Sequence, residues 1–257
     1  MSWLRLRQVA LVAERLQPVE AELCEILGVS VCYRDPGVAV FGLENALFPV
    51  GNQFLEVVAP TRDGTAGGRY LERRGGDGGY MVILQASDHP PIRQRVEKLG
   101  VAIAFEREMD DYHIMQLHPR DTRGTFLEID DQRGPDAHEP DGPWHPAGPD
   151  WKQGQRLERV LGIEAAEIQS EDPAALAEHW SRILAAPPRQ HDDGRWTLQL
   201  ENASLRFVPC QDGRPEGLGG IDLRCSDREA IMASARQHDA VIGEDLVHLC
   251  GMRIQLL

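Results

Sequence analysis

The chain has 257 residues, enough for one large or two ordinary domains, and its 42% hydrophobic residues can supply a core. Its net charge of −14 argues against nucleic acid as a partner, because phosphate binding relies on Lys and Arg. No run approaches the roughly 18 apolar residues of a membrane helix, and the five cysteines form no CxxC pair, which together predict a cytoplasmic protein with reduced thiols and no membrane partner.

The first predicted unit combines a strand, a helix and three further strands. RQVALVAE at residues 7–14 is strand-like, and the apolar residues of 18–28 recur at helical spacing before Gly28. Three short strand candidates follow at VSVCYR, VAVFGLENALFPV and NQFLEVVAP, each bounded by Gly, Pro or Asn. The unit therefore has the order strand–helix–strand–strand–strand.

The same order recurs along the rest of the chain. A second unit begins with YMVILQASD and ends with TFLEID at residue 130. Two more units begin at LGIEAAEIQSED and GGIDLRCSD, and the last of them is slightly short. Because a repeat at a fixed period is a strong fold signal, four tandem βαβββ units are the main structural prediction.

Two segments rich in glycine or proline separate these units. RRGGDGG at 73–79 leads into a strand-like run, whereas a phosphate-binding loop leads into a helix whose free N–H groups hold the anion. We interpret it as a joint whose glycines permit positive φ and close strand approach. The segment 131–156 is dense in proline, which excludes helix and central strand and predicts an exposed linker. It divides the chain into domains of residues 1–130 and 157–257.

The tandem units and their local motifs resemble the vicinal oxygen chelate superfamily, which includes glyoxalase I, methylmalonyl-CoA epimerase, extradiol dioxygenases and bleomycin-resistance proteins. Over residues 6–130, GLENALFPVGNQFLEVVAP looks like a glyoxalase-like domain, and LHPRDTRGTFLEI looks like the closing strands of the epimerase. Over residues 158–257 only the module pattern is similar. The resemblance implies an α+β fold of tandem βαβββ modules paired into half-open barrels, as two glyoxalase-like domains, the second degenerate.

In this family each module contributes metal ligands from its first and last strands. The resemblance places the four ligand positions at Gln8, Glu56, Met81 and Glu128. Met81 stands where most relatives have histidine, and thioether sulfur suits soft Cu(I) rather than the divalent metals of the family. The remaining set of Gln8, Glu56 and Glu128 predicts either a weakly bound divalent cation (Mg, Mn, Co or Ni) or no metal.

In the second half, the corresponding positions carry Ala165, Arg206, Gly220 and Gln255. No metal-binding set survives among these residues. We therefore expect a structural or dimer-mimicking domain, with anion binding at Arg206 as the alternative.

Without the family, Gln8, Glu56 and Glu128 are single polar residues within apolar strand runs. Alternation alone would also allow both glutamates to face solvent on a half-exposed sheet. If they point into a concave pocket instead, two close carboxylates raise one pKa, which suits proton transfer α to a carbonyl.

Five further residues, together with Met81, complete the candidate site. His113 is a candidate catalytic group near neutral pH, with a partly exposed strand histidine as the alternative. Phe48 and Tyr80 fit a plain core equally well. The residues expected to line the substrate pocket are Asn45, Phe48, Asn52, Tyr80 and Met81.

Three functions stay open at this point. The first is a lyase or isomerase of the glyoxalase or epimerase type, in which Glu56 and Glu128 move a proton of a small carbonyl compound and Gln8 polarises an oxygen. The second is a metal-free protein that sequesters a small molecule, as bleomycin-resistance relatives do. The third is a non-catalytic structural or interaction domain. The chain would act as a monomer or a homodimer.

Overall fold

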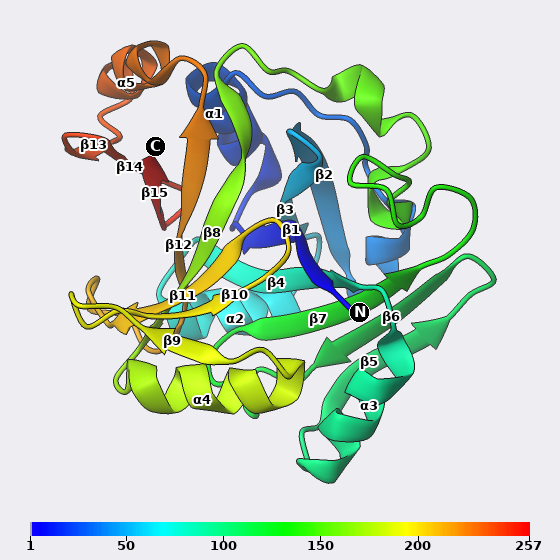
Figure 1. The fold of residues 1–257 in the computed structure, drawn as a ribbon. Coiled ribbons are helices and arrows are strands. Elements are labelled where there is room, and N and C mark those ends of the chain that lie inside the picture. Colours follow the sequence, from blue (N-terminus) through cyan, green and yellow to red (C-terminus); the bar gives the residue numbers. More distant parts are fainter. Residues whose placement is uncertain (1) are drawn as a thin grey trace.

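The first two predicted units form one mixed sheet in the computed structural model, which describes residues 2–257 (Figure 1). Its strands are β1 (Leu4–Val12), β2 (Leu43–Val50), β3 (Gln53–Pro60), β4 (Gly78–Ala86), β5 (Ile103–Glu108), β6 (Tyr112–Leu117) and β7 (Phe126–Gln132). They lie in the order β2-β3-β1-β4-β7-β6-β5. The first and last strands of each unit pair in parallel, and the two units join through the antiparallel pair β1–β4.

The last two units form a second mixed sheet with the same plan. Its strands are β8 (Val160–Ser170), β9 (Pro188–Gln190), β10 (Trp196–Gln199), β11 (Ser204–Pro209), β12 (Gly217–Cys225), β13 (Val241–Gly243), β14 (Leu246–Leu249) and β15 (Met252–Leu256). The order is β13-β14-β15-β12-β8-β11-β10-β9, and the units again join through an antiparallel pair, β8–β12. The predicted α+β fold of tandem modules is thus confirmed.

Two strand predictions of the first unit, for residues 29–34 and 38–41, differ from the structure. VSVCYR at 29–34 contributes only an isolated bridge between Tyr33 and Leu47. The residues that follow form the 3-10 helix η1 (Pro36–Phe41), in which the Asp35 side chain accepts a hydrogen bond from the Gly37 N–H. Proline fixes φ in the first turn, and Gly42 closes the helix at φ 70°. The strand prediction for 38–41 was wrong because this local turn chemistry outweighs the apolar run.

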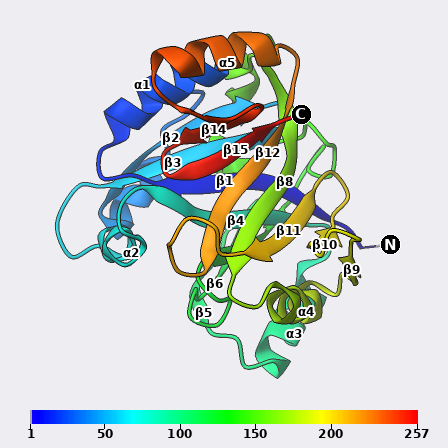
Figure 2. The same ribbon diagram turned by 90° about the vertical axis from the view of Figure 1, so that its left-hand side faces the viewer.

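Four helices pack in two pairs, each pair formed by one helix from each half of the molecule. They are α1 (Leu16–Leu27), α3 (His89–Lys98), α4 (Pro173–Leu184) and α5 (Arg228–Gln237). Helix α1 packs on α5, and α3 packs on α4, so each contact joins one half to the other (Figure 2). The larger hydrophobic core accordingly contains residues of both halves, including Phe48 on β2 and Trp180 on α4. Among the helices of residues 2–257, none combines the length and apolar character that a membrane crossing requires.

The glycine-rich joint begins at the end of a helix that the sequence did not predict. Helix α2 (Ala66–Arg74) starts at Thr65, whose hydroxyl accepts a hydrogen bond from the Gly68 N–H, and ends at Gly75 with φ 75°. A Cβ at Gly79 would lie 2.5 Å from the Leu218 carbonyl oxygen on β12. The joint therefore uses both expected properties of glycine, positive φ and close approach.

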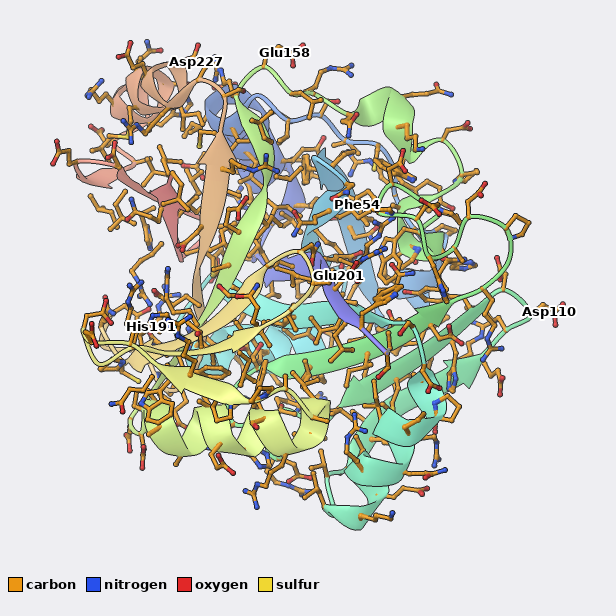
Figure 3. The ribbon with its side chains drawn as sticks, viewed as in Figure 1. Phe54, Asp110, Glu158, His191, Glu201 and Asp227 are labelled. Atoms are coloured by element: carbon orange, nitrogen blue, oxygen red, sulfur yellow. The ribbon has the colours of Figure 1, made fainter. Side chains whose placement is uncertain are left out.

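The proline-rich segment between β7 and β8 is an exposed linker only in part. It forms the short helices η2 (His145–Ala147) and η3 (Trp151–Gly154), and it folds back over the first sheet (Figure 1). Trp144 and Trp151 are 1% and 2% exposed, and the Trp151 ring meets the Phe54 ring edge-on at 5.1 Å. Charged residues such as Asp110, Glu158 and Asp227 lie at the periphery instead, while Phe54 lies inside (Figure 3). The two buried tryptophans thus hold this segment against the first sheet, although its prolines and acidic residues predicted exposure to solvent.

Candidate active site

A cavity of about 430 Å³ lies against the first sheet and is bounded by η1 and η2. Most of its wall is apolar, with Phe41, Phe105 and Phe126 among the larger side chains. The polar groups that line it are Gln8, Asp35, Glu56, Arg107, Tyr112, Gln116, His118, Glu128 and His145. An apolar cavity with a few convergent polar groups is the usual form of a small-molecule site.

Glu56 on β3 is held by hydrogen bonds from two neighbouring strands. The Asn45 side-chain amide donates to Oε1 at 2.7 Å, and the Gln8 amide donates to Oε2 at 2.8 Å. Glu56 as a whole is only 6% exposed. Burial raises the pKa of Glu56 to about 7, the nearby Glu128 adds to this, and the two amide donors oppose it.

Gln8 is itself oriented by the proline-rich segment. The indole N–H of Trp144 donates to Gln8 Oε1 at 2.8 Å, which leaves the Gln8 NH₂ group to face Glu56. The neighbouring Arg7 donates to the carbonyl oxygens of Asn52 and Gly142, at 2.9 and 2.7 Å. A shift in the β1–β4 register between Leu6 and Gln8 allows consecutive polar side chains to serve this region.

Glu128 and Asp130 place a second acidic group on β7. Alternate residues of a strand share a face, so both side chains point from β7 in the same direction. The two carboxyl groups lie close enough for the charge of Glu128 to raise the pKa of Asp130. Tyr112 donates its hydroxyl to Asp130, and the Met115 N–H donates at 3.3 Å. Burial raises the pKa of both carboxyls.

Tyr80 and Met81 both line the cavity although they are neighbours on β4. The β1–β4 register shifts between the pairs Ala10–Met81 and Leu11–Gly79, which leaves Tyr80 without a partner on β1. Such a bulge turns two consecutive side chains toward one side of a strand. Tyr80 also contacts Tyr70 and Phe126 edge-on, at 5.0 and 5.1 Å between ring centroids.

Four of the predicted residues do not line the cavity: Asn45, which contacts it only through its hydrogen bond to Glu56, and the three described next. His113 lies on the opposite face of β6, where its Nε2 is 3.2 Å from Glu106 and its ring is 4.1 Å from that of His89. Phe48 belongs to the larger core. Asn52 lies in the turn between β2 and β3 and uses its carbonyl oxygen to hold Arg7. His113 was assigned to the wrong face because alternation along β6 directs Tyr112, Ile114 and Gln116 inward instead.

The sequence interpretation missed several residues of the site. Asp130 could have been found from its i+2 spacing to Glu128, and Tyr112 from its alternation with Ile114. His145, an exposed residue of η2, also lines the cavity, and its ring stacks on that of Tyr112 at 5.1 Å between centroids. Trp144 and His145 gave no such signal, because their position depends on how the segment after β7 folds back.

The residues at the family's metal positions do not fit a tightly held transition metal. Both Glu56 oxygens and the Gln8 amide oxygen already accept hydrogen bonds from Asn45, Gln8 and Trp144. Met81 supplies a thioether where an imidazole is expected. Within residues 2–257, no group of three or more His, Cys, Asp or Glu side chains is arranged to hold a metal ion.

The corresponding place in the second sheet is filled by ion pairs. Ala10 pairs with Glu56 and Met81, and Glu167 likewise pairs with Arg206 and Gly220, so the two sheets match position by position. Arg206 forms ion pairs with Glu167 and Asp222. Arg253 donates to the other Glu167 oxygen at 2.7 Å. Since Arg206 is already paired with two carboxylates, the alternative of anion binding there loses its basis.

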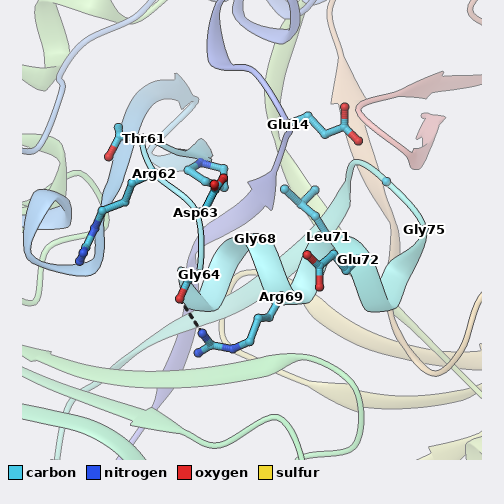
Figure 4. Close-up of a pocket in the computed structure, with 12 residues that line it drawn as sticks. Glu14, Thr61, Arg62, Asp63, Gly64, Gly68, Arg69, Leu71, Glu72 and Gly75 are labelled. Atoms are coloured by element: carbon cyan, nitrogen blue, oxygen red, sulfur yellow. Dashed lines mark hydrogen bonds between the residues drawn. The ribbon is translucent and has the colours of Figure 1, made fainter.

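A larger hollow of about 720 Å³ lies on the surface beside α2 (Figure 4). Its charged residues, among them Arg62, Asp63 and Glu72, are exposed. Arg69 donates to the Gly64 carbonyl oxygen at 2.7 Å and so closes the loop before α2. This hollow lacks the buried titratable groups of the first cavity, so we place the candidate site in the first cavity.

Comparison with known proteins gives the class to which this fold and cavity belong. The model of the glyoxalase-like domain matches residues 9–184. The chain belongs to this family, within the vicinal oxygen chelate superfamily. The search of curated proteins returned no significant match.

One solved structure shares the fold over nearly the whole chain, and others are similar to half of it, all at low sequence identity. A hypothetical protein from Staphylococcus aureus is 10% identical, with a TM-score of 0.66, over 99% of this chain and 98% of that chain. The methylmalonyl-CoA epimerase of Streptomyces coelicolor is 18% identical, with a TM-score of 0.46, over 51% of this chain and 99% of that chain. The methylmalonyl-CoA epimerase of Mycobacterium tuberculosis is 20% identical, with a TM-score of 0.44, over 50% of this chain and 88% of that chain.

Proposed function

We propose that the cavity of the first sheet is the active site of an enzyme that moves a proton at the carbon next to a carbonyl group, with Glu56 as the general base. The observation that carries this proposal is the buried Glu56 carboxyl, which faces an apolar cavity and has a pKa of about 7. A general base works best when its pKa lies near the working pH, because it is then both ionised and strong.

The contacts of Glu56 suit this role. Each Glu56 oxygen accepts one hydrogen bond, from Asn45 or from Gln8. A carboxylate oxygen has a second lone pair, which can accept a further hydrogen bond or a proton. The two donors fix the carboxyl plane, so that the remaining lone pairs keep one direction. Gln8 has a second amide proton, which is available to polarise a substrate oxygen.

The cavity restricts the substrate to a small and largely apolar carbonyl compound. Its volume of about 430 Å³ and its lining by Phe41, Phe105, Met109 and Phe126 favour an apolar body. An apolar lining also excludes water, which strengthens every electrostatic interaction inside the cavity. The reaction class is that of an isomerase or lyase, without a tightly bound metal.

Exchange of carbon-bound hydrogen in D₂O tests this proposal. The purified protein is incubated with phenylacetone and 2-phenylpropanal, and loss of the α-proton signals is followed by ¹H NMR. We expect exchange above the buffer rate, and a loss of at least 100-fold in Glu56→Gln. The matched control is Glu44→Gln, a change of an exposed residue on β2. Exchange at the wild-type rate in Glu56→Gln would remove Glu56 as the base.

The apolar wall also supports a second candidate, a protein that binds an apolar small molecule without turnover. Both Glu56 oxygens have partners within the protein, so the cavity can accept a ligand that ignores the carboxyl. This candidate predicts that phenylacetone raises the melting temperature of the wild type and of Glu56→Gln equally. Hydrogen exchange at the bound ligand, lost in Glu56→Gln, would exclude it.

A further inference from the structure

The wall of the first cavity carries an arginine whose charge has no counterion within residues 2–257. Arg107 on β5 lines this cavity. The side chains next to it in the wall are apolar: Phe105 and Met109 lie two residues away in the chain, and Ile114 is its partner on β6. A charged group beside an apolar surface is stabilised only where water or a ligand contacts it.

The alternation of β5 separates Arg107 from the two acidic residues beside it in the sequence. Arg107 points into the cavity, whereas Glu106 and Glu108 point to the outer face of the strand. There Glu106 pairs with Arg93 at 2.8 Å, and Glu108 pairs with Arg133 at 3.0 Å. Both glutamates thus have cations of their own, and neither neutralises Arg107.

The carboxylates that line the cavity are also engaged elsewhere. They are Asp35, Glu56 and Glu128. Asp35 caps η1 by accepting a hydrogen bond from the Gly37 N–H at 2.8 Å, and the two glutamates are buried on β3 and β7. In the part of the chain that the structure describes, the ion pairs of β5 are those of its glutamates, so the guanidinium of Arg107 is free to bind an anion.

Arg107 lies at the mouth of the cavity. The Phe41 ring of η1 meets the Phe105 ring of β5 edge-on at 5.1 Å between centroids, so η1 reaches the edge strand of the first sheet there. Two residues further along this strand, Arg107 is exposed, while Glu56 and Glu128 are buried deeper in the same cavity. The cavity therefore has carboxyl groups inside and a cation at its entrance.

The strand register gives the scale of this arrangement. Glu128 is level with Gln116 on β6, and Gln116 is level with Phe105 on β5. The Cα atoms of Glu128 and Arg107 are thus separated by two strand spacings and two residues along the strand, which is roughly 12 Å. A molecule of several carbon atoms can extend from the inner carboxyl groups to the arginine.

We propose that the substrate of this cavity is an apolar carbonyl compound with a carboxylate several carbon atoms from its carbonyl group, and that Arg107 binds this carboxylate. The inference rests on the proposed function and names its substrate class. A guanidinium offers a carboxylate two parallel N–H donors, which fixes direction as well as charge. Arg107 thus determines specificity and takes no part in the proton transfer.

Calorimetry with two compounds that differ only in charge tests this inference. The probes are 5-oxo-5-phenylpentanoate and its methyl ester, which contain the same ketone. We expect the acid to bind the wild type at least tenfold more tightly than the ester, and Arg107→Gln to abolish this difference by weakening the acid alone. The binding of the ester then shows that the variant is folded. Arg189→Gln is the matched control, because it removes the same charge from an exposed residue of an edge strand in the second sheet.

Three results would overturn the inference. They are equal affinities of the acid and the ester in the wild type, no binding of either compound, and a change in Arg107→Gln that is the same for both compounds or absent. Each would leave Arg107 as a guanidinium whose apolar stem covers the wall and whose charge is held by water.

Hydrogen exchange at C4, the carbon next to the ketone, separates this inference from the proposed function. We expect Arg107→Gln to raise the KM of the acid at least tenfold, with the effect confined to KM, because the arginine contacts the far end of the substrate. An unchanged KM of the acid would contradict the inference and leave Glu56 as the base. Absence of exchange in the wild type, with tighter binding of the acid retained, would remove the proposed function and leave Arg107 as a carboxylate-binding residue.

Discussion

Trp144 and Gln8 are 136 residues apart in the chain, and the indole N–H of Trp144 donates to Gln8 Oε1 at 2.8 Å. The bond fixes which end of the Gln8 amide faces Glu56. Through Trp144, the segment that follows β7 therefore sets the orientation of the carboxyl that we propose as the base. The family's metal position is thus occupied by a hydrogen-bond chain of three side chains.

Trp144→Phe should weaken this chain while keeping most of the buried ring. The Gln8 oxygen would lose its donor, which costs about 1–3 kcal/mol for a buried polar group. We expect a corresponding loss of unfolding free energy in urea denaturation and a tenfold slower hydrogen exchange. Trp151→Phe is the control, since Trp151 packs on Phe54 through its ring. Equal rates in the two variants would show that the indole bond does not position Glu56.

Glu56 should make the stability of the protein fall as the pH rises. Its folded-state pKa is about 7 and the ordinary value is 4.5, so the folded state binds the proton more tightly than the unfolded state. The favourable contribution is complete below pH 4.5, and it is lost between about pH 4.5 and 7. A shift of this size corresponds to about 3 kcal/mol.

The measurement is the unfolding free energy of the wild type and of Glu56→Gln at several pH values between 4.5 and 8. The difference between the two proteins removes the contribution of Glu128 and Asp130, whose raised pKa values act in the same direction. We expect this difference to change by about 3 kcal/mol across the range. A difference that is constant with pH would mean that Glu56 ionises normally in the folded protein.

Much of this architecture could be predicted from the sequence, because its signals are local. Apolar runs bounded by Gly and Pro predicted the tandem units, and the family resemblance then singled out Gln8, Glu56 and Glu128 within them. The unpredicted η1 depends on the turn chemistry of Asp35 and Pro36, which overrides an apolar run. A 3-10 helix there forms part of the cavity wall through Phe41.

The missing part of the site depends on contacts between distant segments. Trp144 and His145 reach the cavity only because the chain after β7 turns back over the first sheet. The prolines and acidic residues of that segment predicted exposure to solvent, but burial of Trp144 and Trp151 holds the segment against the first sheet. His113 shows a second limit of sequence prediction. It follows Tyr112 directly on β6, so an error of one residue in the strand alternation assigns it to the cavity face instead of the opposite face.

Met81→His should restore the ligand set that the family uses. An imidazole at this position, together with Glu56 and Glu128, would suit Ni²⁺ or Co²⁺ far better than a thioether. We expect calorimetry to give at least tenfold tighter Ni²⁺ binding in Met81→His than in the wild type. Ile83→His, on the same strand and also in the cavity wall, controls for an added imidazole alone. Equal affinity in Met81→His and Ile83→His would show that the ligand geometry of the family has been lost.

The ion pairs of the second sheet should contribute to stability and not to the activity of the first cavity. Arg206→Met leaves Glu167 and Asp222 buried without their shared cation, which costs about 3–5 kcal/mol when one partner of a buried pair is removed. Arg224→Met is the matched control, because the pair of Arg224 with Glu164 is exposed and worth about 1 kcal/mol or less. Urea denaturation measures both, and hydrogen exchange under native conditions should be the same in the two variants. A loss of exchange in folded Arg206→Met would instead link the second sheet to the chemistry of the first.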